Sequence, residues 1–344
     1  MNIEDEWNEF LLDDSYELND ETENRSEIKD MPKCSDLYIS TTTKIAYLNN
    51  TVDLKNIFWK LPLLHYYDEK NGIIKKQMKF NSLTQEDVDE LDENLEKNKG
   101  RYIENSILQQ VSKENTITAF KDVRKISVGI CKKDITSYRI KKKSAFYNCF
   151  VLILRIKQGG IFKELHVKIF NTGKLELPGI QTKEIFVLVL EEVLNVLRPF
   201  FDGKLDYYHE KTETVLINSN FNCGFLINRE EFFKLLKYKY KIHATYDPCS
   251  YPGIQCKYRE NNLNISFMIF RTGSVLIVGK CVEEDLYTVY DYLNKILLAE
   301  FSSIYQQSSM PIVEVPQKKK VKKTKKKLIK IKLDDKNKLD LDNK

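Results

Sequence analysis

The chain has 344 residues, of which 42% are apolar, and a formal net charge of +5. This length and apolar content allow one two-part domain or two domains with a buried core, and they exclude a wholly disordered protein. Its seven cysteines form no C-x-x-C pair, its four histidines are scattered, and it has no apolar run of about 18 residues. We therefore expect a soluble protein of a reducing compartment, with no metal, no cofactor and no membrane contact.

The charge is concentrated at the two ends of the chain. Residues 1–36 carry 13 acidic and three basic side chains, and residues 318–344 carry 13 lysines and four aspartates. Neither end has the apolar content to fold alone, so we expect a disordered acidic tail over 1–36 and a disordered Lys-rich tail over 311–344. The Lys-rich tail either contacts phosphates, serves as a nuclear address or keeps the protein soluble.

The segment Glu4–Leu18 of the acidic tail mixes carboxylates with large apolar side chains, among them Trp7 and Phe10. Acidic residues around an apolar stripe can imitate DNA, so this segment is a candidate to occupy a DNA-binding face or to recruit an activator. The alternative is an acidic tail without a specific partner.

The first half of the middle region predicts a strand, a short helix, antiparallel strands and a long helix. An alternating run begins at Tyr38 and precedes the short helical pattern TVDLKNIFWKL, and a second strand-like run covers Cys149–Ile156. The hairpin pattern Val167–Gln181 then leads into an amphipathic helix that begins at Thr182.

Residues 66–144 interrupt this order and are interpreted as an insertion. They include a charged, almost glycine-free segment that we expect to be helical in part, and Ile126–Ser144, which we expect to add a strand and a basic loop. The insertion lacks the apolar stripe of an independent domain. It either offers a surface to partner proteins or has no specific role.

The second half repeats the order of the first. The strand-like run TVLINSNFNCGF precedes a short helix, where Asn228 and Glu231 suit an N-cap and a capping box. A second hairpin pattern, SFMIFRTGSVLIVGK, and a second amphipathic helix from Val282 follow. Four pairs of residues share an offset of 100: Phe170 and Phe270, Thr172 and Thr272, Gly173 and Gly273, and Gly179 and Gly279.

This duplication predicts two α+β repeats, 37–206 with its insertion and 207–310. In each repeat we expect the long helix to cover one face of an antiparallel sheet and to leave the other face without a helix. Two such sheets paired edge to edge would form one long curved surface, and a ligand is expected on its uncovered face.

The repeated segments resemble the TATA-box-binding protein family. Where the family has YxPxxFPGxxY, the second half has Tyr246, Pro248 and YPGIQCKY; where the family has IFxSGKxVxTGAK, it has IFRTGSVLIVGKC. The first half is similar in IFNTGKLELPGI and CFVLILRI, and the insertion suggests the divergent branch found in large DNA viruses. The resemblance implies an α+β fold: a pseudo-symmetric saddle of two repeats, each a curved antiparallel sheet with two helices on its outer, convex face.

In this family, aromatic side chains wedge between base steps and kink DNA from the minor groove. Phe170 and Phe270 match one wedge of each repeat, and Tyr251 matches the second wedge of the second repeat. In the first repeat Cys149 is the literal match for that second wedge. Two nearby phenylalanines are available if the register is shifted: Phe150 and Phe146.

Other candidates come from the family's phosphate contacts and from strand alternation. Arg155 and Lys257 match phosphate-contacting arginines, and Lys174 matches a third basic site. Alternation along the hairpins and the position of a central family asparagine add further residues to the DNA-facing side: Lys168, Met268, Leu276, Val278 and Thr41.

Some positions depart from the family pattern. Glu176 would place a carboxylate near phosphates, Pro178 replaces a threonine that contacts bases, and Leu216 stands at a central asparagine. We therefore expect that A·T-specific reading of the minor groove is altered or lost.

The resemblance implies a general transcription factor that binds and bends promoter DNA through the minor groove and nucleates assembly of the initiation machinery. Its implied partners are AT-rich double-stranded promoter DNA, general transcription factors and RNA polymerase, with a single copy of the chain on the DNA. It would act in the nucleus or, for a virus, in a cytoplasmic factory or virion. The alternative is a scaffold of the same fold that binds proteins of a transcription complex and has little sequence-specific DNA binding.

An enzyme is not expected, because no arrangement typical of catalysis can be placed in the sequence. Acidic pairs such as Glu191 with Glu192, and Glu283 with Glu284, fall on helix faces that we expect to be exposed.

Overall fold

The computed structural model describes residues 31–111, 120–136, 147–260 and 263–306. They form two compact units. The first unit lies within Thr43–Glu213, and the second combines the described residues of Met1–Thr42 and Thr214–Lys318. Most of the predicted acidic tail, including Glu4–Leu18, and the whole predicted Lys-rich tail lie outside the described residues.

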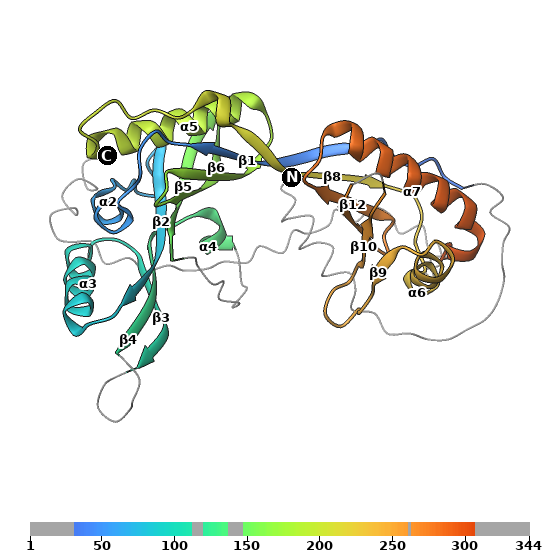
Figure 1. Ribbon diagram of the computed structural model, residues 1–344, viewed down its shortest axis with the longest axis horizontal. Helices are drawn as coiled ribbons and strands as arrows, with labels where there is room; N and C mark the ends of the chain where they lie inside the picture. The colour runs from blue at the N-terminus through green and yellow to red at the C-terminus, as the bar shows by residue number, and fades with distance from the viewer. Residues whose placement is uncertain (1–30, 112–119, 137–146, 261–262, 307–344) are drawn as a thin grey trace, which may run out of the picture. The chain divides into compact units, whose positions relative to one another are not determined.

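The first unit is built on a sheet with the strand order β3-β4-β2-β5-β6-β7-β1 (Figure 1). The neighbouring pairs from β3 to β7 are antiparallel. Its elements in chain order are β1 (Tyr38–Tyr47, of which Thr43–Tyr47 belong to this unit), α2 (Leu54–Lys60), β2 (Gly72–Ser82), α3 (Gln85–Lys97), β3 (Ile103–Val111), β4 (Lys121–Gly129), α4 (Lys132–Thr136), β5 (Cys149–Gln158), β6 (Ile161–Phe170), β7 (Lys174–Ile180), α5 (Lys183–Leu197), η2 (Arg198–Phe200) and η3 (His209–Lys211).

The second unit has a sheet with the strand order β1-β8-β12-β11-β10-β9, to which β1 contributes Tyr38–Thr42. The pairs from β8 to β9 along this order are antiparallel. Its further elements are β8 (Glu213–Asn222), α6 (Arg229–Lys234), the π-helical turn η4 (Leu235–Lys239), β9 (His243–Thr245), β10 (Ile254–Tyr258), β11 (Ile265–Ile269), β12 (Ser274–Gly279) and α7 (Glu283–Ile304).

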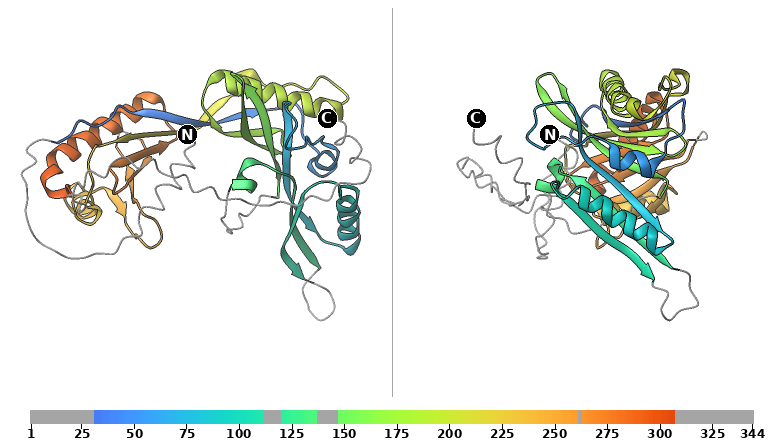
Figure 2. Two further views of the ribbon diagram at one scale, coloured as in Figure 1. Left: turned by 180° about the vertical axis from the view of Figure 1, so that it is seen from behind. Right: turned by 90° about the vertical axis from the view of Figure 1, so that its left-hand side faces the viewer.

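Each unit has its own hydrophobic core on one face of its strands. In the first unit, α2 and α5 share a core with β5, β6 and β7, and in the second unit α6 and α7 share a core with β10, β11 and β12. Figures 1 and 2 show α5 and α7 each lying on one side of the strands of its own unit. Alternate residues of the strands point into these cores: Leu165, Val167 and Ile169 in β6, and Ile265, Phe267 and Ile269 in β11. We call the opposite face of each sheet its open face.

The helix starts agree with the sequence pattern. The Thr182 hydroxyl accepts a hydrogen bond from the Ile185 N–H (3.3 Å) and caps α5. The Asn228 side chain caps α6 by accepting from the Glu231 N–H (3.3 Å). The Glu231 carboxylate pairs with Lys234 (2.7 Å), so it does not complete the predicted capping box.

The predicted insertion contains a strand of the sheet itself. β2 pairs with β5 from Gly72 to Met78, in the same way as β9 pairs with β10 in the second unit. The elements α3, β3, β4 and α4 extend from this strand. The helix α3 starts with a capping box between Thr84 and Asp87, which is consistent with the expected helical content of this segment.

Lys76 of β2 is a buried cation inside the first core. Its side chain is only 2% exposed, and its ammonium donates to three carbonyls around the end of α2: Phe58 O (2.7 Å), Leu61 O (3.0 Å) and Trp59 O (3.2 Å). Burial lowers the pKa of Lys76 from 10.5 to about 8. The carbonyls orient the ammonium but do not replace its full hydration.

This burial predicts a pH dependence of stability. Between about pH 8 and 10.5 the unfolded chain binds the Lys76 proton that the folded chain has released, so the free energy of unfolding should rise with pH in that window. Relative to Lys76→Met, which cannot titrate, we expect the native protein to gain roughly 1–3 kcal/mol across it. Urea denaturation of both proteins at several pH values measures this difference, and a constant difference would contradict the buried cation.

Candidate nucleic-acid interface

The open face of the second unit presents a mainly apolar strip. Met268 lies opposite Leu276 in the β11–β12 ladder, and Val278 lies opposite Asn218 in the β12–β8 ladder. All four side chains are partly exposed on the face that α6 and α7 do not cover. The structure therefore brings together the three apolar residues that strand alternation predicted for this face.

An asparagine row runs beside this strip. Asn218, Asn220 and Asn222 alternate along β8, and the Asn218 amide donates to the Thr41 hydroxyl (3.1 Å). Sequence reasoning considered Leu216 and Thr41 here and missed the asparagines. In INSNFN the asparagines recur at every second position, which places all three on one face of a strand. This pattern could have predicted the row.

Phe270 and Tyr251 form a ring pair at the end of β11. Their centroids are 6.0 Å apart, and Phe270 is only 3% exposed because Tyr251 and Gly253 pack against it. Burial raises the pKa of Tyr251 from 10 to about 12. The two candidates thus lie together, but Phe270 is covered and would have to be uncovered before it could enter a DNA step.

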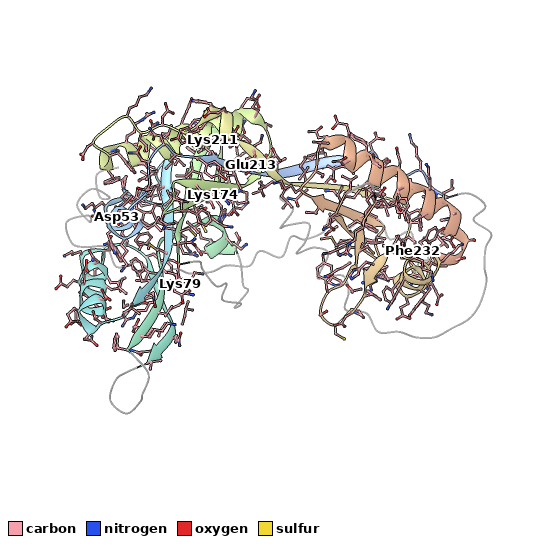
Figure 3. The ribbon with its side chains drawn as sticks, in the orientation of Figure 1. Asp53, Lys79, Lys174, Lys211, Glu213 and Phe232 are labelled. Atoms are coloured by element: carbon pink, nitrogen blue, oxygen red, sulfur yellow. The ribbon has the colours of Figure 1, made fainter. Side chains whose placement is uncertain are left out.

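Phe170 occupies the corresponding end of β6 in the first unit. It is partly exposed, and the Lys174 ammonium lies 5.5 Å from its ring centroid. Figure 3 labels Lys174 among the side chains of this unit. The turn that follows contains Gly173 with φ +82°, where an added Cβ would lie 2.4 Å from the Asn50 carbonyl oxygen. Gly273 has the same φ and an equally close carbonyl, that of Phe225. These two glycines therefore serve the hairpin turns.

Tyr147 is the counterpart of Tyr251 that sequence matching missed. Continuing the β5–β6 register places Tyr147 opposite Thr172, and continuing the β10–β11 register places Tyr251 opposite Thr272. Tyr147 is 49% exposed, and the Lys79 ammonium lies 3.7 Å from its ring centroid. An aromatic residue two positions before the literal match Cys149 was the signal in the sequence.

Phe150 was a wrong wedge candidate. Cys149 pairs directly with Phe170, so the register is not shifted and Phe150 faces the core. Phe150 is fully buried, with its ring 6.2 Å from that of Phe58.

Arg155 was a wrong candidate for a free phosphate contact. It is 8% exposed, and its guanidinium donates to the carbonyls of Tyr66 (2.6 Å) and Asp68 (3.0 Å). The Tyr66 ring lies 4.6 Å from the guanidinium carbon. Arg155 therefore anchors the loop before β2, whereas Lys257 on β10 is exposed.

The open face of the first unit is more polar and partly covered. Lys168 pairs with Glu176 across the β6–β7 ladder (2.5 Å), so each neutralises the other. Nearer β2, the α4 segment packs on this face, where Asp134 pairs with Lys75 (2.7 Å) and Glu164 accepts from the Lys132 N–H (2.9 Å). The uncovered part of this face therefore lies toward Phe170.

The described part of the chain contains neither a cluster of metal ligands nor a membrane-spanning helix. Within it, no group of three or more His, Cys, Asp or Glu side chains could hold a metal ion. None of its helices is long and apolar enough to cross a membrane.

Comparison with known proteins places these features in context. Residues 217–299, which include the strip and the asparagine row, match the family model described as "Transcription factor TFIID (or TATA-binding protein, TBP)". The description is that of a transcription factor, in line with the expectation that the chain is not an enzyme.

Two relatives and one solved structure are similar to the chain. It is 25% identical over 199 residues to the "TATA-box-binding protein-like" protein of Acanthamoeba polyphaga mimivirus, covering 50% of this chain and 54% of that protein. It is 26% identical over 129 residues to the "TATA-box-binding protein" of Methanococcus maripaludis, covering 38% and 66%. The chain thus spans only part of the length of these relatives. The solved structure of Methanococcus jannaschii TBP aligns with a TM-score of 0.39 at 15% identity, over 76% of this chain and 97% of that one.

Proposed function

Because the chain is a divergent member of the TATA-box-binding protein family, we propose that its open faces bind the minor groove of promoter DNA and that the bound DNA is bent. The observation that carries this proposal is the open face of the second unit. There the apolar strip Met268, Leu276 and Val278 suits sugars and base edges, and the Asn218 amide suits the acceptors of A·T pairs. On the bent DNA the protein would gather general transcription factors and RNA polymerase.

The aromatic residues would produce the bend. In this proposal, Tyr251 with Phe270 and Tyr147 with Phe170 insert at base steps from the two units. Lys257 and Lys174 would contact phosphates beside them. The test is binding of the full chain to labelled AT-rich and GC-rich duplexes at several salt concentrations. Tight binding that is lost when open-face residues are replaced supports the proposal. Binding that responds to salt concentration but not to these replacements contradicts it.

A scaffold function is the second candidate, and the first unit favours it. The α4 segment covers part of its open face, and the Lys168–Glu176 pair removes the free positive charge that a phosphate would need. In that case the faces would bind proteins of a transcription complex, and the duplexes above would be bound weakly and without a bend.

The Lys168–Glu176 pair gives a direct prediction. Glu176→Gln removes a carboxylate from the open face and with it the ion pair to Lys168, so the positive charge of this face increases and the affinity for DNA should rise severalfold. The slope of log affinity against log salt should steepen by about 0.9, as for one added phosphate contact. Salt titrations of duplex binding measure both effects. Glu93→Gln on the exposed side of α3 is the matched control, and an equal change in both variants would mean that only net charge matters.

A further inference from the structure

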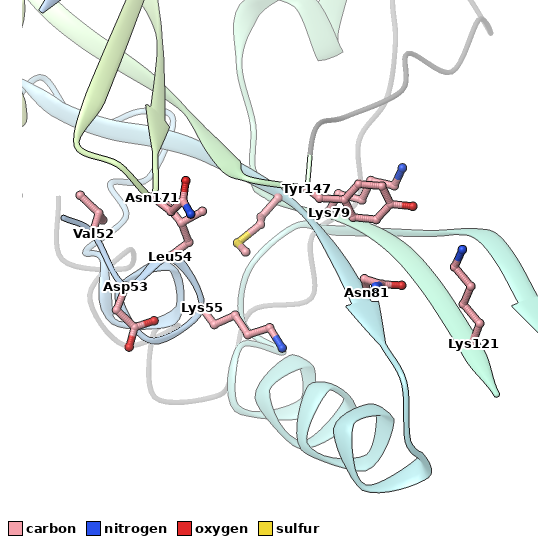
Figure 4. Close-up of a pocket in the computed structure, with 10 residues that line it drawn as sticks. Val52, Asp53, Leu54, Lys55, Lys79, Asn81, Lys121, Tyr147 and Asn171 are labelled. Carbon is pink, nitrogen blue, oxygen red and sulfur yellow. The ribbon is translucent and has the colours of Figure 1, made fainter. Parts of the chain in front are cut away.

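A basic hollow of about 500 Å³ lies in the first unit, beside the turn that follows Phe170 (Figure 4). It is lined by three lysines from three separate elements: Lys55 of α2, Lys79 of β2 and Lys121 of β4. Among the described residues no ion pair is formed by these three ammonium groups, and the Asp87 carboxylate at the start of α3 interacts with Lys55 only through their charges. The acidic lining residue, Asp53, is already engaged, because it caps α2 by accepting from the Asn56 N–H (3.2 Å).

The rest of the lining is not suited to a purely anionic ligand. Leu54 and Met78 supply apolar wall, and the half-exposed Tyr147 ring offers a surface for a second aromatic group. The Asn81 side-chain oxygen is buried and has no donor among the described residues. The backbone of DNA offers acceptors only, whereas a polypeptide supplies N–H donors. The hollow therefore fits an acidic peptide that carries a large apolar side chain.

This chain contains such a peptide in its own acidic tail. Glu4–Leu18 has carboxylates on both sides of Trp7, Phe10 and Leu11, and it lies ahead of the first described residue. The stretch between Leu18 and Met31 spans at most about 45 Å when fully extended, which sets the distance from Met31 that the segment can reach. We propose that Glu4–Leu18 docks in this hollow, with its carboxylates at Lys55, Lys79 and Lys121 and an aromatic side chain against Tyr147.

Docking there would also regulate DNA binding, a consequence that rests on the proposed function. Tyr147 lines the hollow and is also one of the aromatic residues proposed to insert into DNA. A docked tail would hold this ring and neutralise three lysines close to the DNA. The segment would then compete with DNA at the edge of the open face, without filling the face itself.

Tryptophan fluorescence of the full chain tests the docking without DNA. The chain has two tryptophans, so Trp59→Phe leaves Trp7 as the only reporter. We expect Trp7 emission to be blue-shifted, and its quenching by acrylamide to be severalfold weaker than in the free peptide Glu4–Leu18. The variant Lys55→Glu/Lys79→Glu/Lys121→Glu should return both values to those of the peptide.

A variant with the same charge change outside the hollow is the control. Lys183→Glu/Lys237→Glu/Lys295→Glu alters three exposed lysines on other elements and should leave Trp7 protected. The proposal is overturned if Trp7 is as accessible as in the free peptide, or if both triple variants expose it equally. If Trp7 is accessible and the Lys55/Lys79/Lys121 variant instead lowers the salt dependence of duplex binding, the hollow belongs to DNA phosphates. Because Trp7 fluorescence is measured without DNA, an accessible Trp7 would contradict the docking of the tail and not the proposed DNA binding.

Discussion

Replacing Phe170 and Phe270 together by alanine is expected to abolish DNA bending and to weaken binding by about 1–3 kcal/mol for each ring. The two rings end equivalent strands before turns formed by Gly173 and Gly273, and an inserted ring is what would unstack a base step. Without the rings, the remaining apolar and basic contacts can hold a straight duplex but cannot kink it. Fluorescence energy transfer between labelled duplex ends measures the bend, and titration of the same signal measures affinity.

A folding control is needed because Phe270 is almost fully covered. Phe233→Ala removes a ring of the second unit that packs against Tyr246, away from the strip on the open face. This variant should bend DNA like the native protein, and thermal melting compares its loss of stability with that of the double variant. A double variant that melts like Phe233→Ala and still bends DNA would rule out insertion by these two rings.

Leu276→Glu should weaken DNA binding by roughly 2 kcal/mol or more, because it places a carboxylate on the open face of the second unit. Glu176 occupies the equivalent place in the first unit, where Lys168 neutralises it. At Leu276 the cross-strand partner is Met268, which cannot compensate the charge. Leu276 is partly exposed, so the change does not remove a core side chain.

Two further variants separate charge from loss of apolar contact. Leu276→Gln changes polarity without charge and should retain most of the affinity. Met268→Lys/Leu276→Glu reproduces the Lys168–Glu176 arrangement and should recover binding to about the level of Leu276→Gln. Equal binding by Leu276→Glu and Leu276→Gln in duplex titrations would show that DNA does not approach this face.

The order of the elements could be predicted because it depends on local patterns. The two long helices begin after Thr182 and Val282, where an amphipathic pattern follows a strand. The turns at Gly173 and Gly273 were readable because each glycine adopts a positive φ that other residues disfavour. Helix starts and hairpin turns depend on residues a few positions apart in the chain, so they could be predicted from the sequence.

The corrected candidates depend on contacts between distant residues. Arg155 had the right type and place in its strand, but the carbonyls of Tyr66 and Asp68 bind its guanidinium. No pattern within β5 could reveal a partner 87 or 89 residues earlier in the chain. The neutralisation of Glu176 by Lys168 likewise required the cross-strand register.

Tyr147 and Phe150 show how a small change of offset misleads sequence matching. The pairs Phe170/Phe270 and Gly173/Gly273 are 100 residues apart, whereas Tyr147 and Tyr251 are separated by 104. Matching CFVLILRI to the family pattern pointed to Cys149 and its neighbour, and only the strand register identified the exposed ring of Tyr147.

The most direct test of minor-groove bending compares three duplexes in which A·T pairs are retained, replaced by inosine·cytosine or replaced by G·C. Inosine·cytosine presents the minor-groove acceptors of A·T but a different major groove, and G·C adds an amino group in the minor groove. End-to-end energy transfer with the full chain should show that the A·T and inosine·cytosine duplexes are bent alike. No bend in any duplex, or a bend in the A·T duplex alone, would contradict recognition through the minor groove.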